Sequence, residues 1–380
     1  MATGSVHDKE CVIIIGTYIN ACSIFQCLKK IDYQFPIVLI DPSIDGNTKC
    51  LADIWLKQSV IKKKIQNVEE ITAVINDSVD LGTKKIILMT AEEFIDPIKH
   101  GIADGRLSNT ISYTGSELGN EQIFNRFEFY RFIEDIEGVS VPKTIDYSEN
   151  PNRVFGNDYI IRVKKSWEQD KKLPRLQIVH SIEEKKKVET EFIREGLKPQ
   201  MWCYQELLST LDTNNVSVCG WYDAAFKQYA VTRKLVQHPP KTGNGDVVEI
   251  FEEAPDSIVQ ATDAILEKLK YSGPFEMEFV FDVNSSEYKV IELNPRFWMQ
   301  HGLVEQVTDQ ALVRRAVGAP VESKDYKSLK HRYWINGNQM LYRLAKGQVR
   351  MLKYMKNGTC YPPLRIAAKW FAFYHAYKRA

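Results

Sequence analysis

The chain has 380 residues, of which 44% are hydrophobic and 26% are charged, as expected of a folded globular protein and not of a disordered one. A chain of this length can form two or three units with cores of their own. The formal net charge of +1 is unevenly distributed, since no Asp or Glu follows Asp325 while twelve Lys and Arg do. Subtracting those twelve from the 50 basic residues leaves 38 basic against 49 acidic groups in residues 1–325, a net charge of −11 that argues against nucleic acid as a partner.

Seven cysteines are scattered along the chain without the paired spacing of a zinc site or a disulfide framework. We therefore expect reduced thiols and a cytoplasmic protein. Residues 1–10 are polar and lack the apolar centre of a signal peptide, and no apolar run approaches the length of a membrane span. These features disfavour a secreted or an integral membrane protein.

The first structured unit is predicted from alternating apolar runs and helical stretches. Residues 11–16 form a continuous apolar run that ends at glycine, as expected of a strand buried on both faces. Helical spacing over residues 21–30, a strand at 35–41, a helical stretch around 68–75 and a strand at 85–90 follow. This order predicts a doubly wound α/β domain with a parallel sheet.

The first loop of this unit does not support dinucleotide binding. Its sequence, GTYINA from Gly16, lacks the second and third glycines that let a backbone approach a pyrophosphate. Asp41 ends the second strand where a ribose-binding carboxylate would stand, but Asp is also a common turn former. We therefore do not expect NAD.

Residues 119–137 are predicted to form an amphipathic helix or a pair of helices. Phe124, Phe127, Tyr130 and Ile133 recur at spacings of three and form an apolar stripe. Arg126, near the start, either directs a cation at a ligand or is an exposed helix cation.

Two short strands, residues 158–165 and 176–179, flank a highly charged segment. Lys164 ends the first strand, which suits a mobile flap with a phosphate-directed lysine; the alternative is a solvated lysine on an edge strand. A charged helix at 183–196 leads to a strand at 200–208 that carries Glu206 before two leucines. A buried Glu needs a donor, which is an adenine amine or, equally well, a backbone or arginine group.

The next segment is predicted to be a hairpin of residues 216–221 and 228–233 that ends at Arg233 and Lys234. A loop rich in Pro and Gly covers residues 238–245, and an amphipathic helix covers residues 257–269.

A second hairpin carries the strongest signal for a functional site. Residues 275–282 and 289–297 alternate apolar and polar side chains around a turn centred on Ser285. Antiparallel pairing about this turn places Glu278 opposite Glu292, with Asn294 on the same face. Two carboxylates directly opposite each other repel, and a divalent cation is the simplest group to offset the repulsion. Arg296 adds a cation suited to a phosphate; the alternative is a solvent-facing hairpin without a function.

Residues that follow this hairpin are predicted to be its neighbours only. In particular, we expect His301 to be packed or hydrogen-bonded and not a catalytic base. From residue 331 onward the chain mixes aromatic residues with ten Lys and Arg at helical spacing. Such a tail either lies on an anionic membrane surface or packs on the acidic body, and nucleic acid is the least favoured partner.

The order of these elements over residues 10–315 resembles the ATP-grasp superfamily, in the branch of biotin carboxylase, carbamoyl-phosphate synthase and the carboxylate–amine ligases. Glu278-Phe279 followed by the run from Val290 to Phe297 is similar to the "EF … EiNpR" signature of that family. Weaker similarities stand in the expected order: residues 138–142 to "gvpvP", residues 161–164 to "vvvKP" and residues 205–208 to "QEyI".

The resemblance implies a mixed α/β fold of three parts. Residues 1–118 would form a Rossmann-like domain with a doubly wound parallel sheet. Residues 119–320 would form a two-lobed ATP-grasp domain with a small mobile lid at about 150–205, and residues 321–380 a basic, mainly helical extension.

The resemblance also implies site residues for ATP and for magnesium, with two ions expected and manganese as an alternative metal. Glu278, Glu292 and Asn294 would hold the metal, and Arg296 would contact the transferred phosphate. Lys164 and Arg126 would bind phosphates, Glu206 would accept from the adenine amine, and the backbone of Leu208 would meet the ring edge. Arg233 and Lys234 would serve the γ-phosphate or the carboxylate substrate.

Two departures from the family pattern are visible. Asn125-Arg126 replaces the common Asp-Lys pair, which keeps the cation with a different geometry. The loop after Lys164 has no glycine through Pro174, so that phosphate binding there would use side chains such as Lys171, Lys172 or Arg175.

The implied function is an ATP-dependent ligase that joins a small-molecule carboxylate to an amine through an acyl phosphate. One alternative is a nucleotide-binding regulatory or scaffolding protein of this fold without ligase chemistry. Another is a ligase for a membrane-attached, glycan- or lipid-linked substrate, with the tail in peripheral contact with the membrane. A homodimer is left open.

Overall fold

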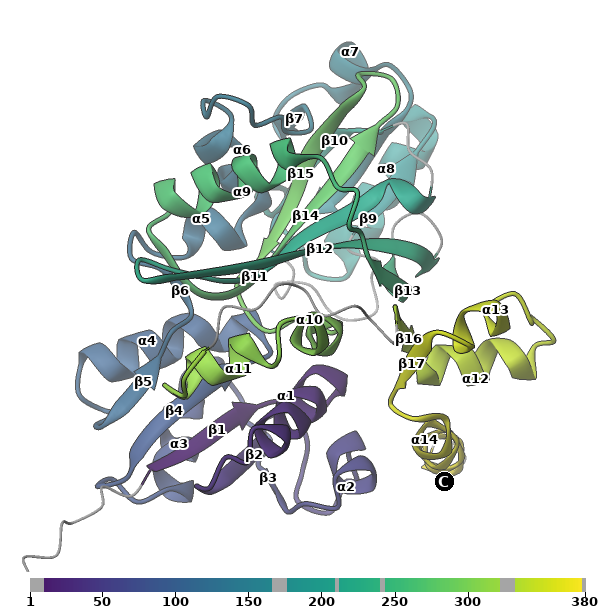
Figure 1. Ribbon diagram of the computed structural model, residues 1–380. Coiled ribbons are helices and arrows are strands. Elements are labelled where there is room, and N and C mark those ends of the chain that lie inside the picture. The colour runs from purple at the N-terminus through teal and green to yellow at the C-terminus, as the bar shows by residue number, and fades with distance from the viewer. Residues whose placement is uncertain (1–9, 166–175, 209–211, 240–242, 322–331, 378–380) are drawn as a thin grey trace, which may run out of the picture.

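The computed structural model describes residues 10–165, 176–208, 212–239, 243–321 and 332–377, and it contains three β-sheets (Figure 1). A parallel sheet at the bottom of Figure 1 carries the N-terminal unit. A four-stranded antiparallel sheet and a larger sheet, antiparallel except for its last pairing, make up the rest. The mixed α/β fold predicted from the sequence is confirmed.

The N-terminal sheet has the strand order β3-β2-β1-β4-β5, and all four pairings are parallel. The predicted strands at 11–16, 35–41 and 85–90 correspond to β1, β2 and β4. The sequence did not reveal β3, whose three residues stand among lysines without an apolar run. The strands are β1 (Glu10–Ile15), β2 (Ile37–Asp41), β3 (Val60–Lys62), β4 (Lys84–Met89) and β5 (Thr110–Ser112). The helices are α1 (Ile19–Lys30), α2 (Leu51–Trp55), α3 (Ile71–Ser78) and α4 (Ile95–Ala103), with 3₁₀ turns η1 (Val68–Glu70) and η2 (Glu92–Phe94).

A four-stranded antiparallel sheet of order β7-β10-β8-β9 is covered by one long helix, α8, and is named here the lid after the expectation from the sequence. Its core is small and is formed around Tyr159, Phe192 and Trp202. The helix predicted at 119–137 is a pair, because Asn125 ends the first helix and caps the second through its side chain. The strands are β7 (Thr144–Asp146), β8 (Tyr159–Val163), β9 (Leu176–Val179) and β10 (Trp202–Glu206). The helices are α5 (Glu121–Phe124), α6 (Arg126–Ile133), α7 (Pro151–Phe155) and α8 (Ile182–Arg194), with η3 (Pro199–Met201) before β10.

The largest sheet has the order β15-β14-β11-β12-β13-β16-β17, and a short β6 also pairs with β14. Both predicted hairpins lie in it, as β11–β12 and β14–β15. The sequence did not reveal β13, β16 or β17. The strands are β6 (Gly115–Ser116), β11 (Asn215–Asp223), β12 (Phe226–His238), β13 (Asn244–Ile250), β14 (Tyr271–Asp282), β15 (Glu287–Asn294), β16 (Tyr333–Asn336) and β17 (Gly358–Tyr361). The helices are α9 (Asp256–Lys268), α10 (His301–Val307), α11 (Ala311–Ala316), α12 (Gly337–Ala345), α13 (Leu352–Met355) and α14 (Leu364–Tyr377), with η4 (Asp212–Asn214) before β11.

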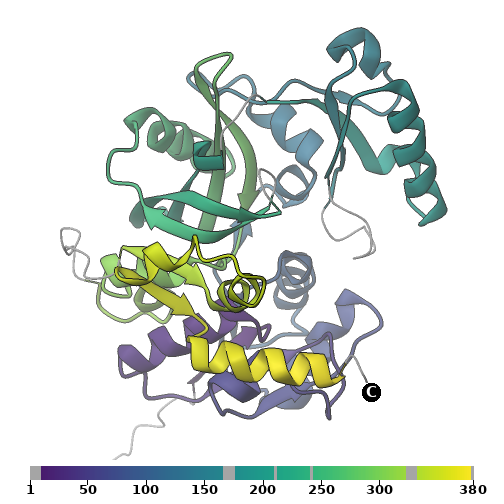
Figure 2. The same cartoon turned by 90° about the vertical axis from the view of Figure 1, so that its right-hand side faces the viewer.

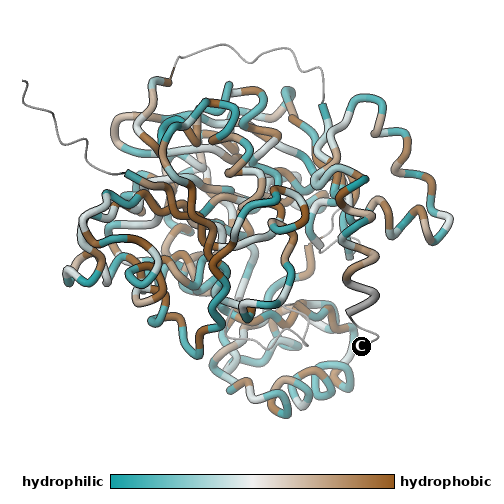
Figure 3. Tube along the Cα trace, turned by 90° about the horizontal axis from the view of Figure 1, so that it is seen from below, coloured by the Kyte–Doolittle hydropathy of each residue, from teal (hydrophilic) through white to brown (hydrophobic). Residues whose placement is uncertain are grey.

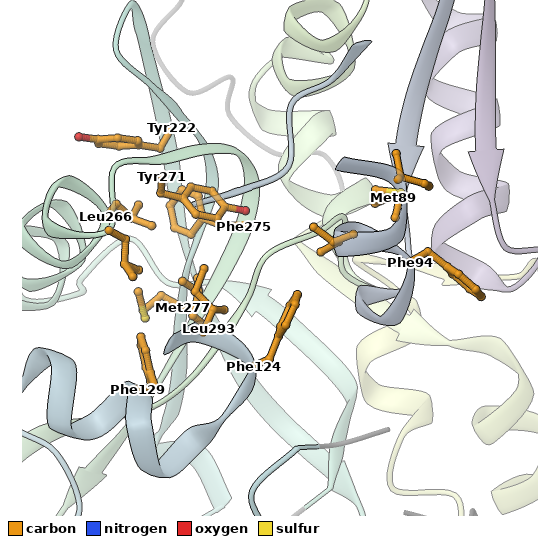
Figure 4. Close-up of a cluster of buried hydrophobic side chains, with 14 of the residues drawn as sticks. Met89, Phe94, Phe124, Phe129, Tyr222, Leu266, Tyr271, Phe275, Met277 and Leu293 are labelled. Carbon is orange, nitrogen blue, oxygen red and sulfur yellow. The ribbon is translucent and has the colours of Figure 1, made fainter. Parts of the chain in front are cut away.

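One face of the β14–β15 hairpin is anchored in the main hydrophobic core. Figure 4 shows Phe275, Met277 and Leu293 of the hairpin packed with Phe129 and Leu266 from the covering helices. Burial of each such side chain stabilises the fold by about 1.5–3 kcal/mol. Because side chains alternate along a strand, this anchoring turns Glu276 and Glu278 to the opposite face.

The C-terminal extension packs on the rest of the chain. Strand β16 pairs with β13, and β17 pairs with β16, so that the extension completes the large sheet. Trp334 is fully buried and stacks on Tyr361. Helix α14 runs across the N-terminal unit, where it contacts α2 (Figure 2). Of the two placements left open by the sequence, packing on the body therefore holds for most of the described part of the tail.

Apolar stretches recur in each part of the molecule when the chain is coloured by hydropathy (Figure 3). Within the described residues, no helix combines the length and the hydrophobicity that crossing a bilayer requires. All seven cysteines are free thiols, as the sequence predicted.

Candidate functional site

The predicted register of the β14–β15 hairpin is observed. Glu278 lies opposite Glu292, and Glu276 lies opposite Asn294. Near the turn, however, Asp282 pairs with Glu287, so that the turn is centred half a residue before Ser285. A bulge at Ile291, whose carbonyl accepts a hydrogen bond of 2.8 Å from Tyr130, restores the alignment of the two carboxylates.

Two buried cations hold the facing carboxylates. Lys234 Nζ lies 2.6 Å from Glu278 Oε2, and Arg126 Nη2 lies 2.6 Å from Glu292 Oε1. Burial lowers the pKa of Lys234, but Glu278 and Glu276 outweigh burial and leave this pKa above its usual value. Glu292 does the same for the pKa of Arg126. In the described structure, Lys234 and Arg126 therefore offset the repulsion between Glu278 and Glu292, a role that the sequence analysis assigned to a metal ion.

Glu276 is a third carboxylate of the site, and the sequence analysis missed it. The Asn294 amide donates to Glu276 at 3.2 Å and to Glu278 at 3.4 Å. Burial and the negative charge of Glu278 raise the pKa of Glu276 to about 8. The two-residue period of a strand, which places residues 276 and 278 on one face, was the signal that could have found it.

Arg296 joins the hairpin to the N-terminal unit. Its guanidinium donates to Asn294 Oδ1 at 3.1 Å and approaches Glu92 to 4.0 Å. The next residue, Phe297, donates its backbone N–H to the carbonyl of Met89 at the end of β4. In the sheet order, β1 and β4 are the strands from which the chain turns to opposite sides, and ligands of open α/β sheets bind outside the carboxyl ends of such strands. Arg296 therefore lies at the topological switch point.

Arg233 does not join the carboxylates, so the geometry does not support its predicted place at the site. It follows Thr232 and precedes Lys234 on β12, so its side chain points to the other face of the sheet. There Arg233 Nε donates to Glu249 at 2.9 Å, and the guanidinium lies 4.1 Å from the centroid of the Phe251 ring.

Lys164 is held in the lid by an acidic partner. Its Nζ lies 2.6 Å from Asp146 Oδ2 and 4.9 Å from the centroid of the Phe127 ring. Burial raises the pKa of Asp146, but the hydrogen bonds from Lys164 and Ser148, together with the charge of Lys164, outweigh burial and lower this pKa. Lys164 is 11% exposed and follows β8, an interior strand of the lid, so it is not a solvated lysine of an edge strand. Its carbonyl accepts from the backbone N–H of Arg126 at 3.0 Å, which brings it beside the carboxylate cluster.

Glu206 stands where the lid meets the hairpin. Its Oε1 accepts from the backbone N–H of Lys143 at 2.8 Å and from Lys289 Nζ at 2.6 Å. The backbone alternative for its donor is thus observed, together with a lysine that the sequence analysis had not considered. Leu208 follows β10 and is half-buried. The charged loop with Lys171, Lys172 and Arg175 lies outside the described residues.

The donor set on the hairpin fits magnesium when a phosphate completes it. Among the described residues, no three acidic, histidine or cysteine side chains form a metal centre by themselves. Two carboxylates and one amide oxygen nevertheless suit Mg²⁺, which takes one or two carboxylates and completes its shell with water and substrate phosphates. The Asn294 oxygen now accepts from Arg296, so binding of a metal there would redirect that guanidinium.

Two side interpretations from the sequence agree with the structure. His301 is fully buried, its Nδ1 contacts the carbonyl of Trp298 at 2.9 Å, and burial lowers its pKa to about 4. Asp41 accepts from Thr17 and from the backbone N–H and hydroxyl of Ser43, as expected of a turn former.

Comparisons with known proteins agree with this fold. Residues 241–322 match the family described as "Carbamoyl-phosphate synthase L chain, ATP binding domain". Biotin carboxylase 1 of Bacillus subtilis (strain 168) is 29% identical over 85 residues, which are 22% of this chain and only 18% of that protein.

Two solved structures extend the likeness over most of the chain. The ADP complex of purK, an N5-carboxyaminoimidazole ribonucleotide synthetase, superimposes with a TM-score of 0.62 at 13% identity and covers 90% of this chain and 85% of that one. The biotin carboxylase domain of Hydrogenobacter thermophilus 2-oxoglutarate carboxylase, with MgADP, ADP and bicarbonate, gives 0.62 at 11% identity and covers 86% and 73%. The chain therefore has the ATP-grasp fold, and the resemblance seen in the sequence is confirmed.

Proposed function

We propose that the protein is an ATP-dependent carboxylate–amine ligase that uses magnesium and forms an amide through an acyl phosphate. One observation carries the proposal: Glu276, Glu278, Glu292 and Asn294 converge on one face of the hairpin. A cluster of buried carboxylates held by cations is costly to maintain in a protein that binds nothing there. The ATP-grasp fold and the nucleotides named for its solved relatives support ATP as the ligand.

Each residue of the site has a role that its position supports. Glu278, Glu292 and Asn294 would hold the metal, which supplies positive charge that neutralises the nucleotide phosphates. Lys234 and Arg126 would then turn from the carboxylates toward phosphate oxygens, as would Lys164 from Asp146. Glu206 would accept the adenine amine in place of Lys289, and the backbone of Leu208 would meet the ring edge.

The chemistry has two steps. An oxygen of the substrate carboxylate attacks the γ-phosphorus of ATP, the bond to the β-phosphate oxygen breaks, and ADP leaves. The amine then attacks the acyl carbon, phosphate leaves, and the amine loses a proton. Phosphoryl transfer of this kind depends mainly on positioning and charge neutralisation, and Arg296 at the switch point would bind the transferred phosphate.

The second candidate is a nucleotide-binding regulatory protein without ligase chemistry. The ion pairs of the site favour it in one respect, because all three acids already have partners within the fold. It predicts ATP binding without turnover, whatever carboxylate and amine are supplied.

A screen of product release separates the two candidates. The full chain with Mg²⁺ and ATP would be offered amino acids and sugar acids in pairs, and ADP and phosphate would be measured. The ligase predicts release that requires both partners of one pair. ATP binding by calorimetry together with no release from any pair would favour the regulatory protein.

Hydroxylamine gives a second measurement. It attacks an acyl phosphate without help from an amine site, so a ligase should form a hydroxamate from its carboxylate and ATP alone. ADP release that never yields a hydroxamate would contradict the acyl phosphate route.

A further inference from the structure

The segment at residues 342–356, named here the α12–α13 turn, is a largely exposed part of the C-terminal extension. It comprises the end of α12, the connection after it and α13. In Figure 1 it forms the right-hand margin of the molecule, and in Figure 2, which is seen from that side, it faces the viewer. The segment therefore projects from the molecule.

Three apolar or aromatic side chains are exposed on this projection. Val349 is 60% exposed, Tyr342 is 44% exposed and Leu352 is 43% exposed. Single exposed apolar residues are ordinary on protein surfaces, but these three fall within eleven residues of sequence. They are held in place from beneath, since Met351 is buried and Leu344 and Tyr354 pack against the same small core.

Four exposed cations surround these side chains: Lys346, Arg350, Lys353 and Lys356. Within the described chain, none of the four forms an ion pair. Lys346 and Lys353 lie near the faces of Tyr342 and Tyr354 instead. No acidic residue occurs after Asp325, so no side chain within residues 332–377 compensates the charge of these four cations.

The rest of the described extension is already occupied. The buried side of α14 packs on the N-terminal unit through Ile366, Ala367 and Trp370. Within the turn itself, Arg343 Nη2 lies 2.9 Å from Oδ2 of the almost fully buried Asp246, so Arg343 is not counted among the four exposed cations. The amphipathic helices α12 and α14 are thus used for folding, and they do not lie flat on an external surface.

We propose that the α12–α13 turn docks the protein on an anionic membrane surface. Exposed apolar side chains on a projection, with exposed lysine and arginine close to them in sequence, suit a membrane interface, where apolar groups enter between the lipids and the headgroups contact the cations. A folded acidic partner would need a complementary hollow for Val349 and Leu352. The acidic remainder of the chain, with its net charge of −11 over residues 1–325, is repelled by the same surface and would orient the turn toward it.

Vesicle co-sedimentation tests this proposal without any turnover, so its outcome is independent of the ligase activity. The full chain should sediment with vesicles of phosphatidylcholine mixed with phosphatidylserine and not with phosphatidylcholine alone. Binding should weaken as the salt concentration rises, because the charges are exposed.

Two variants locate the binding surface. Each Lys or Arg near an anionic leaflet contributes about fivefold in affinity, so K346Q/R350Q/K353Q should weaken binding roughly a hundredfold. V349S/L352S should weaken binding about tenfold or more, through lost apolar burial. The matched control is K64Q/K186Q/K187Q, which removes three exposed lysines elsewhere and should bind as the unaltered chain does.

The outcomes divide clearly. Loss in both variants with retention in the control supports the proposal, provided that circular dichroism and thermal melting match those of the unaltered chain. Failure of the full chain to sediment overturns it and leaves an acidic protein as the occupant. Equal binding by K346Q/R350Q/K353Q and the control also overturns it, because the contact would then lie elsewhere.

Discussion

The hairpin β14–β15 and the lid β7–β10 both carry charged residues of the proposed site, but they hold them differently. On the hairpin, Glu278 and Glu292 belong to one cluster anchored on the main core, and their cations come from β12 and α6. In the lid, Lys164 is paired within its own small sheet, and Glu206 is joined to the hairpin by one lysine.

This difference distinguishes a cluster of paired charges on the hairpin from a lid that has fewer contacts with the hairpin. Removal of one charge from the hairpin leaves others buried and unpaired, which is costly. The lid contacts the hairpin through Glu206 with Lys289, and it contacts α6 through Arg162 with Tyr130. We therefore expect substitutions on the hairpin to affect chemistry and substitutions in the lid to affect nucleotide binding.

The largest effect on turnover is expected at Glu292. Glu292→Gln removes a charged metal ligand and should lower ADP release by roughly a hundredfold to a thousandfold, the range typical of a lost electrostatic contact in a reaction. Glu287→Gln, at the exposed start of the same strand, is the matched control and should retain activity. Turnover by the Glu292 variant at the unaltered rate would break the assignment of the hairpin.

The next largest effect is expected at the adjacent residues Lys234 and Arg233 of β12. Lys234→Met should lower turnover by roughly a hundredfold. The turnover of Arg233→Met should stay within a few-fold of that of the unaltered chain. Each variant breaks one ion pair with a buried acid, Glu278 or Glu249, so the structural cost is comparable. Rates and melting temperatures of both would be measured together. Equal losses of turnover would contradict the opposite placement of the two side chains.

A smaller effect is expected in the lid. Lys164→Ala should raise the KM for ATP about tenfold, since one charged hydrogen bond to phosphate contributes about 1.5–3 kcal/mol, while kcat changes less. Asp146→Asn frees Lys164 and should leave the KM unchanged or lower it. Lys165→Ala is the control, because Lys165 pairs with Glu121 on α5. If Lys164→Ala lowered kcat as strongly as the hairpin variants, the division between the two regions would fail.

His301, packed behind the hairpin, should have the smallest effect on turnover and a visible effect on stability. Its folded pKa of about 4 lies below the ordinary 6.5, so the unfolded chain binds a proton first as the pH falls. Stability should therefore decrease between pH 6.5 and about 4, by on the order of 2 kcal/mol at pH 5. His301→Gln should flatten this part of the melting profile, whereas the same change at the exposed His180 should not. An unchanged slope in the His301 variant would remove this residue as the cause.

The hairpin could be predicted from the sequence because local patterns determine it. The alternation along both strands and the turn residues at 284–286 determined which side chains share a face, and Glu278 lies opposite Glu292 as predicted. The resemblance placed Lys234 and Arg126 at the site, but their pairing with Glu278 and Glu292 could not be predicted, because each pair joins segments far apart in the sequence. The pairing of Asp146 with Lys164 was not predicted either. Arg233 is a different case, because adjacent residues of a strand place their side chains on opposite faces of the sheet. Arg233 and Lys234 therefore could not both face the carboxylates, and the sequence alone was enough to infer this.

The extension shows where composition misleads. Basic and aromatic residues suggested a separate helical tail, yet Trp334 and Ile335 are strand residues buried in the main sheet. Four-residue strands carry too little periodicity to be recognised. Strand β13, the partner of β16, begins within a loop rich in Pro and Gly, and the apolar run that includes Val247 and Val248 is too short to indicate a strand by itself.

The pairing of β13 with β16 has a consequence for the order of synthesis. Strand β12, which carries Lys234, is flanked by β13, and the outer edge of β13 is covered only when residues 333–336 have been made and have paired with it as β16. Until then a nascent chain exposes an unpaired strand edge beside the proposed catalytic lysine, and such edges associate readily with other chains. Pairing of β16 with β13 thus covers this edge and limits aggregation of the nascent chain beside the position where the nucleotide is proposed to bind.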